Sequence, residues 1–165
     1  MKIWNNLLNN KLENNHRFKK TATVFFLLLS FIGFVDATYL TISHYQHSSP
    51  NCNIISGCED VLFSSYSTVA GVPVALAGMF YYLTIFILTV HYLNTKKGKT
   101  ITLTSKLTVL GLLASIYFVY LQIFVIGSFC QFCMLSAIVS TALFALGLSI
   151  LWSRKKKPKD REELI

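Results

Sequence analysis

Long apolar runs alternate with short polar segments along this chain. Three runs contain no Asp, Glu, Lys or Arg, and a fourth contains a single charged residue, Asp36. Each run is about as long as the roughly 20 apolar residues that a helix needs to cross a bilayer. The pattern therefore predicts four membrane-spanning helices, over about residues 21–45, 69–93, 107–129 and 133–152.

The segment between the first two runs carries a local helix signal. Ser56-Gly57-Cys58-Glu59 has the spacing of a capping box, in which side chains satisfy the first N–H groups of a helix. An amphipathic stretch follows, so we expect a short helix through residues 61–63 toward Tyr66, which either lies on the membrane surface or closes the mouth of the bundle. Gly71-Val72-Pro73 predicts the start of the second span, because proline fits a first helical turn.

The composition supports a membrane protein. Of the 165 residues, 53% are hydrophobic and only 13% are charged, against about 25% charged residues in ordinary soluble domains. This balance excludes a disordered chain and a soluble domain. We expect an all-α integral membrane protein of one domain, with a four-helix bundle at 21–152, a mobile basic leader at 1–20 and a basic tail at 153–165.

The positive charges indicate how the bundle is oriented. All 15 Lys and Arg fall before the first span, between the second and third spans, or after the fourth. These three segments share one side of the membrane, and the positive-inside rule makes that side cytoplasmic. Both termini are therefore expected in the cytoplasm, with the basic tail on anionic lipid, and Glu59 and Asp60 outside. Basic residues confined to three segments on one side of the membrane argue against nucleic-acid binding.

The first span contains two features with alternative interpretations. Val35-Asp36-Ala37 resembles a signal-peptide cleavage site, but the apolar stretch before it is too long, which favours a retained helix. Charged residues within a span are costly and often functional. Asp36 is therefore either a proton-handling group or a side chain that is hydrated or hydrogen-bonded near the outer end of its helix.

Four cysteines, Cys52, Cys58, Cys130 and Cys133, fall on the predicted outer face. That side is oxidising in bacteria. Cys130-Gln131-Phe132-Cys133 places two sulfurs on one face of a helix N-terminus, where the helix dipole favours the thiolate. A thiolate is the nucleophile of disulfide exchange. With a second pair on a polar loop, the pattern indicates a relay from partner thiols to an acceptor in the membrane.

Other interpretations of the cysteines remain. A structural zinc site also uses four cysteines, although the spacing of Cys52 and Cys58 is wider than usual, and we expect no metal. The cysteines could instead form structural disulfides in a non-catalytic membrane assembly subunit. Electron transport from cytoplasmic thiols outward would need cysteines on the inner side, and the predicted topology offers none.

Histidines and tyrosines near the spans have less specific interpretations. His44 and His47 follow the first span and are either proton relays or solvated interfacial residues, and His91 is interfacial. Tyrosines are typical of membrane-interface belts, but they could also line a pocket for the acceptor in the membrane. The tyrosines concerned are Tyr81, Tyr82, Tyr117 and Tyr120.

The sequence resembles the vitamin K epoxide reductase family in its bacterial form. The resemblance is carried by residues 33–41, 61–67, 71–82 and 129–136, and by the two cysteines Cys52 and Cys58, which have five residues between them. The order of the cysteines is specific, because the DsbB type of quinone-linked thiol oxidase carries its Cys-x-x-Cys in the first outer loop.

The resemblance implies a membrane thiol:quinone oxidoreductase in the bacterial inner membrane, with the outer loop capping a quinone of the ubiquinone or menaquinone type. Cys130 and Cys133 match the active-site pair, with Cys133 next to the quinone. A partner thiolate would attack Cys52, and the released Cys58 would attack Cys130. Ser64 matches a serine close to the quinone.

The chain also departs from parts of the family pattern. Many bacterial members continue into a thioredoxin-like domain, and this chain contains no further cysteine after Cys133. The expected partner is therefore a separate periplasmic thioredoxin-fold (DsbA-like) thiol oxidase. Animal members place a tyrosine where this chain has Ala137, which argues against epoxide reduction.

Overall fold

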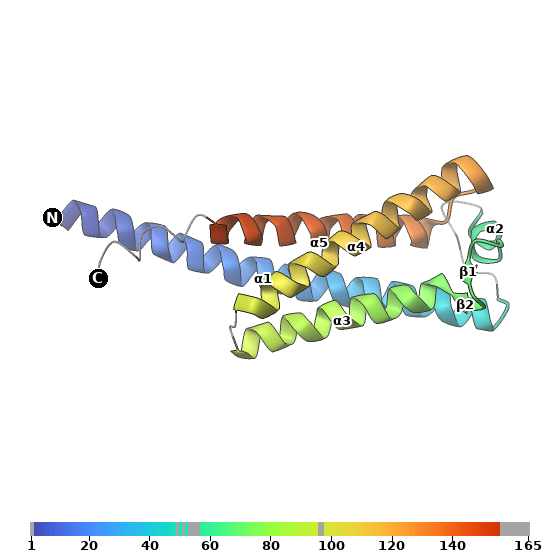
Figure 1. The fold of residues 1–165 in the computed structure, drawn as a ribbon, viewed down its shortest axis with the longest axis horizontal. Coiled ribbons are helices and arrows are strands. Elements are labelled where there is room, and N and C mark those ends of the chain that lie inside the picture. Colours follow the sequence, from blue (N-terminus) through green and yellow to red (C-terminus); the bar gives the residue numbers. More distant parts are fainter. Residues whose placement is uncertain (1, 49, 51, 53–56, 96–97, 156–165) are drawn as a thin grey trace.

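Four long helices form the protein, with a short helix and a small hairpin at one end of the bundle (Figure 1). The computed structural model describes the chain except residues 1, 49, 51, 53–56, 96–97 and 156–165. The elements are α1 (Lys2–Tyr45), α2 (Cys58–Leu62), β1 (Thr68–Val69), β2 (Val72–Pro73), α3 (Val74–Thr95), α4 (Gly98–Tyr120), the π-helix η1 (Leu121–Ile126) and α5 (Gln131–Lys155).

All four predicted spans are present as helices long and apolar enough to cross a membrane. The protein is therefore an all-α, multi-pass membrane protein. Large apolar side chains such as Phe124 and Trp152 are more than 70% exposed, as expected for surfaces that face lipid. The apolar runs predict the helices well because a backbone in lipid must satisfy its hydrogen bonds within its own segment.

Several boundaries differ from the predictions. The leader at 1–20 was expected to be mobile, but residues 2–20 continue helix α1. The second span begins at Val74 rather than near residue 69, because residues 68–73 form the antiparallel hairpin of β1 and β2. The third begins at Gly98 rather than near residue 107, so most of the basic segment predicted between the second and third spans is helical. The fourth begins at Gln131 rather than 133.

The short helix also differs from its sequence signal. Helix α2 begins at Cys58, its N-cap residue is Gly57, and no side chain caps it. Ser56, which the capping box requires, lies outside the described residues. The helix ends at Leu62 rather than continuing toward Tyr66. The helix begins directly after Gly57, whose φ of 134° is a backbone conformation that residues other than glycine rarely adopt.

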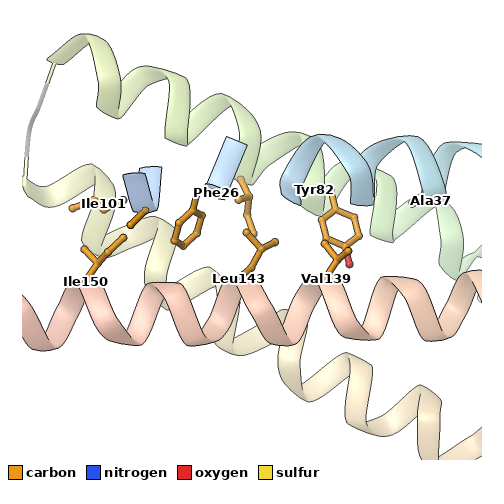
Figure 2. Close-up of a cluster of buried hydrophobic side chains, with 9 residues drawn as sticks. Phe26, Ala37, Tyr82, Ile101, Val139, Leu143 and Ile150 are labelled. Atoms are coloured by element: carbon orange, nitrogen blue, oxygen red, sulfur yellow. The ribbon is translucent and has the colours of Figure 1, made fainter. Parts of the chain in front are cut away.

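The bundle core lies between α1, α3, α4 and α5. Buried side chains from all four helices meet there, including Phe26, Tyr82, Ile101 and Leu143 (Figure 2). Glycines permit two close approaches: a Cβ at Gly33 would collide with the ring of Tyr82, and a Cβ at Gly111 would collide with Tyr81. The small residues thus let α3 pack tightly between α1 and α4.

Candidate redox site

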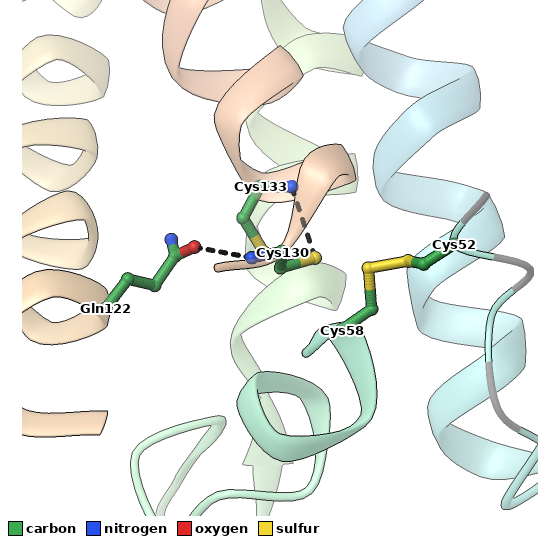
Figure 3. Close-up of a disulfide and its surroundings, with 5 residues drawn as sticks. All are labelled: Cys52, Cys58, Gln122, Cys130 and Cys133. Carbon is green, nitrogen blue, oxygen red and sulfur yellow. Dashed lines mark hydrogen bonds between the residues drawn. A yellow bond between two sulfur atoms is a disulfide. The ribbon is translucent and has the colours of Figure 1, made fainter. Parts of the chain in front are cut away.

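The turn before α5 brings the Cys-x-x-Cys pair to the end of the bundle that carries α2. The π-helix η1 ends at Ile126, and the next residue, Gly127, adopts a left-handed conformation with φ 71°. The chain then reverses direction, and Cys130 directly precedes α5 while Cys133 lies in its first turn. The backbone N–H of Cys133 donates a hydrogen bond to Cys130 Sγ over 3.4 Å (Figure 3). Both sulfurs therefore sit at a helix N-terminus, as the sequence predicts.

Gln122 holds the backbone of this turn. Its side-chain Oε1 accepts a hydrogen bond from the Cys130 N–H over 3.0 Å, and its side chain is 2% exposed (Figure 3). Gln122 lies in η1, and π-helical turns often occur at functional sites. Sequence reasoning missed this residue, although a glutamine inside an apolar span is a usable signal.

The loop pair is a disulfide that lies against the same turn. Cys52 and Cys58 are bonded, with their Cα atoms 6.4 Å apart. A Cβ at Gly57 would lie 3.1 Å from the Ser128 side chain and 3.2 Å from the Phe129 carbonyl oxygen, so glycine permits this approach. Ser128 Oγ also donates a hydrogen bond to Asp60 Oδ2 over 3.0 Å. Helix α2 is thus docked on the turn that precedes Cys130.

The four sulfur-bearing side chains form one cluster. Cys58 is 2% exposed and Cys130 is 1% exposed, and both belong to a buried group against which Cys52 and Cys133 pack. Cys52 is only half-buried. The cluster therefore has a more accessible sulfur on the loop, two buried sulfurs in the middle and Cys133 on the bundle side. This is the order that a thiol relay requires.

Cys130 is the more acidic thiol expected of an exchange site. A hydrogen bond with the Cys133 side chain lowers the pKa of Cys130 from 9.0 to about 7, and backbone groups of Cys133 and Phe132 act in the same direction. Burial and the negative charge of Asp36 oppose this shift. Cys130 is therefore substantially thiolate at neutral pH, which favours it both as a nucleophile and as a leaving group.

Cys133 lines a cavity of about 370 Å³ between the bundle helices. This volume lies within the usual range for small-molecule sites. Helix α1 contributes Asp36 and His44, helix α3 contributes Tyr81 and Tyr82, and mostly apolar side chains of α4 and α5 complete the wall. Ser64, predicted to be near the quinone, lines the same cavity, and its hydroxyl donates to the Val61 carbonyl over 2.8 Å.

The wall of the cavity contains polar atoms without partners. The two carboxyl oxygens of Asp36 make no hydrogen bonds among the described residues. Buried polar groups without partners are rare and indicate a missing ligand or a functional role. An apolar ring with polar oxygens at its edge suits such a cavity, so the residues present fit a quinone headgroup.

The remaining predicted residues divide between the cavity and the surface. Tyr81 and Tyr82 line the cavity, whereas Tyr117 and Tyr120 are more than half exposed. His44 also lines it, and its Nδ1 lies 3.2 Å from the Leu62 carbonyl oxygen, which ties α1 to α2. His47 and His91 are exposed. His47 stacks on Phe63 with ring centroids 6.0 Å apart.

The cysteine pairing bears on the zinc interpretation. In the part of the chain that the structure describes, no three His, Cys, Asp or Glu side chains are arranged to hold a metal ion. Cys52 and Cys58 are joined as a disulfide and so cannot supply the thiolates that zinc requires. One bonded pair beside two free thiols favours thiol–disulfide chemistry at this site.

The fold and site thus define a multi-pass membrane protein with two cysteine pairs at one end of its bundle. Comparison with family models gives a match to the vitamin K epoxide reductase family over residues 24–148. Comparison with curated proteins gives no match. The chain belongs to the vitamin K epoxide reductase family, which confirms the resemblance seen in the sequence. This family is one of membrane oxidoreductases that act on disulfides and quinones.

Proposed function

We propose that the protein is a membrane thiol:quinone oxidoreductase that generates disulfides for a separate periplasmic partner of thioredoxin fold. The observation that carries this proposal is the single cluster that contains all four cysteines, with Cys133 in the wall of a cavity. The cluster connects an accessible sulfur on a loop to the interior of the bundle. Membership of the family supports a redox function of this kind.

The chemistry of the chain begins at the loop. A thiolate of the partner attacks Cys52, the more accessible sulfur of the loop disulfide, and Cys58 leaves as a thiolate. Cys58 then attacks Cys130 of an oxidised Cys130–Cys133 pair, and Cys133 leaves. The second thiolate of the partner attacks the partner–Cys52 bond, so the partner leaves as a disulfide and Cys52 becomes a thiolate. Attack of Cys52 on the Cys58–Cys130 bond then restores the loop disulfide and leaves two thiols in the helix pair. This final state has the same cysteine pairing as the structure.

The helix pair faces the acceptor. Ser64 and Tyr81, together with Asp36, are the polar residues we assign to the quinone headgroup, and apolar side chains of α4 would cover its ring. When bound, a quinone of the ubiquinone or menaquinone type would supply an acceptor for two electrons and two protons. Cys133 is the sulfur on the cavity side, and Cys130 is the sulfur on the loop side.

We assign the protein to the inner membrane of a bacterium, with the cysteines outside and both termini in the cytoplasm. The distribution of Lys and Arg supports this orientation. The end of α3, the start of α4 and both ends of the described chain lie at the end of the bundle away from α2 and the hairpin (Figure 1). The described ends of the helices that flank the basic segments are thus at the opposite end of the molecule from the cysteines.

Reconstitution tests the proposed function. Purified protein in lipid nanodiscs receives a reduced thioredoxin-fold oxidase and a short-chain quinone, and reduction of the quinone is followed by absorbance. We expect turnover in the parent protein and none in Cys133→Ala. Thr141→Ala is the matched control, because this exposed side chain on the same helix bonds only to its own helix.

The alternative of a non-catalytic assembly subunit predicts a different result. Its cysteines would react slowly with small reductants, and no quinone would be reduced by the parent protein. Turnover that persists in Cys133→Ala would also reject the proposed electron path.

A further inference from the structure

Asp36 is a buried acid that the fold leaves without a partner. Its side chain is 6% exposed, and neither carboxyl oxygen makes a hydrogen bond among the described residues. The interpretation that Asp36 bonds to a neighbouring helix is therefore not supported there. Burying a carboxyl group without a hydrogen-bond partner is energetically unfavourable, and such groups within membrane spans are usually functional. The carboxyl lines the same cavity as Cys133.

Tyr82 relates the positions of Asp36 and Cys133. Its ring packs on Gly33 of α1, where a Cβ would collide with it, and its hydroxyl donates to the Ser136 carbonyl of α5 over 2.9 Å. Asp36 follows Gly33 by three residues, and Cys133 precedes Ser136 by three. Residues three apart share a helix face.

The two helices run in opposite directions through the bundle (Figure 1). Asp36 and Cys133 are therefore displaced from Tyr82 by one turn toward the same end, the end that carries α2. The carboxyl and the thiol thus lie at one level of the bundle, each one turn from the contact with Tyr82, and both line the cavity.

The surroundings leave the carboxyl without a competing cation. The titratable groups that line the cavity beside Asp36 and Cys133 are Tyr81 and Tyr82 on α3, His44 on α1 and Tyr66. No Lys or Arg lines it in the described part of the chain. The Tyr82 hydroxyl is committed to Ser136, and His44 Nδ1 to Leu62. Asp36 is thus the acid best placed to exchange a proton with the cavity.

We propose that Asp36 is the proton relay of this cavity. As Cys130 and Cys133 are oxidised to a disulfide, the S–H bond of Cys133 breaks and its proton passes to a carboxyl oxygen of Asp36. The two electrons of the dithiol would reduce the quinone to a quinol, and the O–H bond on Asp36 would then break to deliver this proton to one quinone oxygen. The second proton of the quinol balances the one that the Cys130 thiol releases to water when it becomes a thiolate, and it would reach the other quinone oxygen from water. The proposal rests on the proposed function, and it assigns to this acid a proton transfer that the cysteines alone do not provide.

Infrared difference spectroscopy tests the proton directly and needs no quinone. Spectra of the full chain in nanodiscs are compared between two forms. Dithiothreitol reduces Cys130 and Cys133 to the dithiol form, and a chemical oxidant converts them to the disulfide form. We expect a carbonyl band of a protonated carboxylic acid that changes between the two forms and shifts in deuterium oxide. The band should be absent from Asp36→Asn and present in Glu59→Gln, which removes an exposed carboxylate outside the cavity. Absence of any such band in the parent protein would overturn the relay.

Kinetics supply the second measurement. With dithiothreitol as donor and a short-chain quinone as acceptor, kcat of Asp36→Asn should fall about 100-fold, the range of general acid–base catalysis, with KM for the quinone little changed. Glu59→Gln should keep the parent rate. A kcat near that of the parent, or a loss confined to KM, would overturn the relay.

The outcomes separate this proposal from the proposed function. If the parent protein reduces no quinone, the proposed function fails, and the infrared band still decides whether Asp36 exchanges a proton with the cysteine pair. If the parent is active and Asp36→Asn is equally active, only the relay fails. If Asp36→Asn does not fold, the infrared spectrum of the parent labelled with carbon-13 aspartate decides the question alone.

Discussion

Each cysteine has a different local environment. Cys52 is half-buried on a loop, Cys58 and Cys130 are buried, and Cys133 lines the cavity. Cys130 also accepts an N–H from Cys133, while its own N–H is bound by Gln122. Such differences decide which sulfur attacks, because the rate of exchange depends on both thiolate fraction and access.

The lowered pKa of Cys130 predicts how the reduced protein titrates. A pKa of about 7 means that the Cys130 thiol loses its proton as the pH rises through 7, whereas an ordinary cysteine thiol has a pKa of 9.0. In a variant with Cys52→Ser and Cys58→Ser, ultraviolet absorbance of the thiolate should therefore rise with a midpoint near pH 7. The rate of disulfide exchange at Cys130 should decrease below that pH, where the sulfur is a neutral thiol.

The control for this titration removes one sulfur. Adding Cys130→Ser should eliminate the step near pH 7, because Cys133 then stands alone. If the first step of the double variant appears only near pH 9, the hydrogen bond with Cys133 does not stabilise the thiolate.

The candidate site shows what a sequence can predict at the residue scale. The four cysteines were identifiable because their spacing and position relative to the spans are local properties. Gln122 was not, because its function depends on a contact with Cys130 across a chain reversal. The absence of a partner for Asp36 likewise depends on which helices surround it, and this is a property of tertiary packing.

At the scale of elements, apolar runs predict helices better than they predict helix ends. The runs locate all four spans because length and hydropathy decide insertion into lipid. The hairpin at residues 68–73 was missed, since Val69 and Val72 read as part of the apolar run. Its turn requires positive φ at Ala70 and Gly71, of which only the glycine is a sequence signal. The π-helix η1 also has no periodic signal of its own.

The contact between α2 and the turn before α5 predicts the effect of a glycine substitution. In a background of Cys52→Ala and Cys133→Ala, we expect Cys58 and Cys130 to form a disulfide when a chemical oxidant is added to accept the two electrons. Gly57→Ala should slow this reaction about tenfold, because its methyl group would press on Ser128 and Phe129 and cost about 1–3 kcal/mol. The product is measured by non-reducing electrophoresis and peptide mass.

A matched glycine separates contact from backbone strain. Gly71 also has a positive φ, of 79°, but a Cβ there would meet nothing within 4 Å. Gly71→Ala should therefore leave the rate of Cys58–Cys130 formation close to that of the parent background. Equal slowing by both substitutions would mean that backbone strain, and not docking of α2, sets the rate.

At the scale of the whole molecule, the bundle separates two chemical environments. The cysteines, α2 and the hairpin occupy one end, while α3 and α4 meet at the other end (Figure 1). A relay that serves a periplasmic partner works only if the cysteine end faces outward. The orientation predicted from Lys and Arg is therefore a condition of the proposed function, and it can be measured independently of catalysis.

Single reporter cysteines test this orientation. In a chain without its four native cysteines, Val69→Cys places a thiol on β1, where the native side chain is 66% exposed, and Thr95→Cys places one at the exposed end of α3. In intact bacterial spheroplasts, a membrane-impermeant maleimide should label Val69→Cys and should label Thr95→Cys only after permeabilisation. Both variants keep the helices intact, so each serves as the other's control. Labelling of Thr95→Cys alone in intact spheroplasts would place the cysteines in the cytoplasm, where the cell keeps thiols reduced, and a disulfide-generating relay to a periplasmic partner would be excluded.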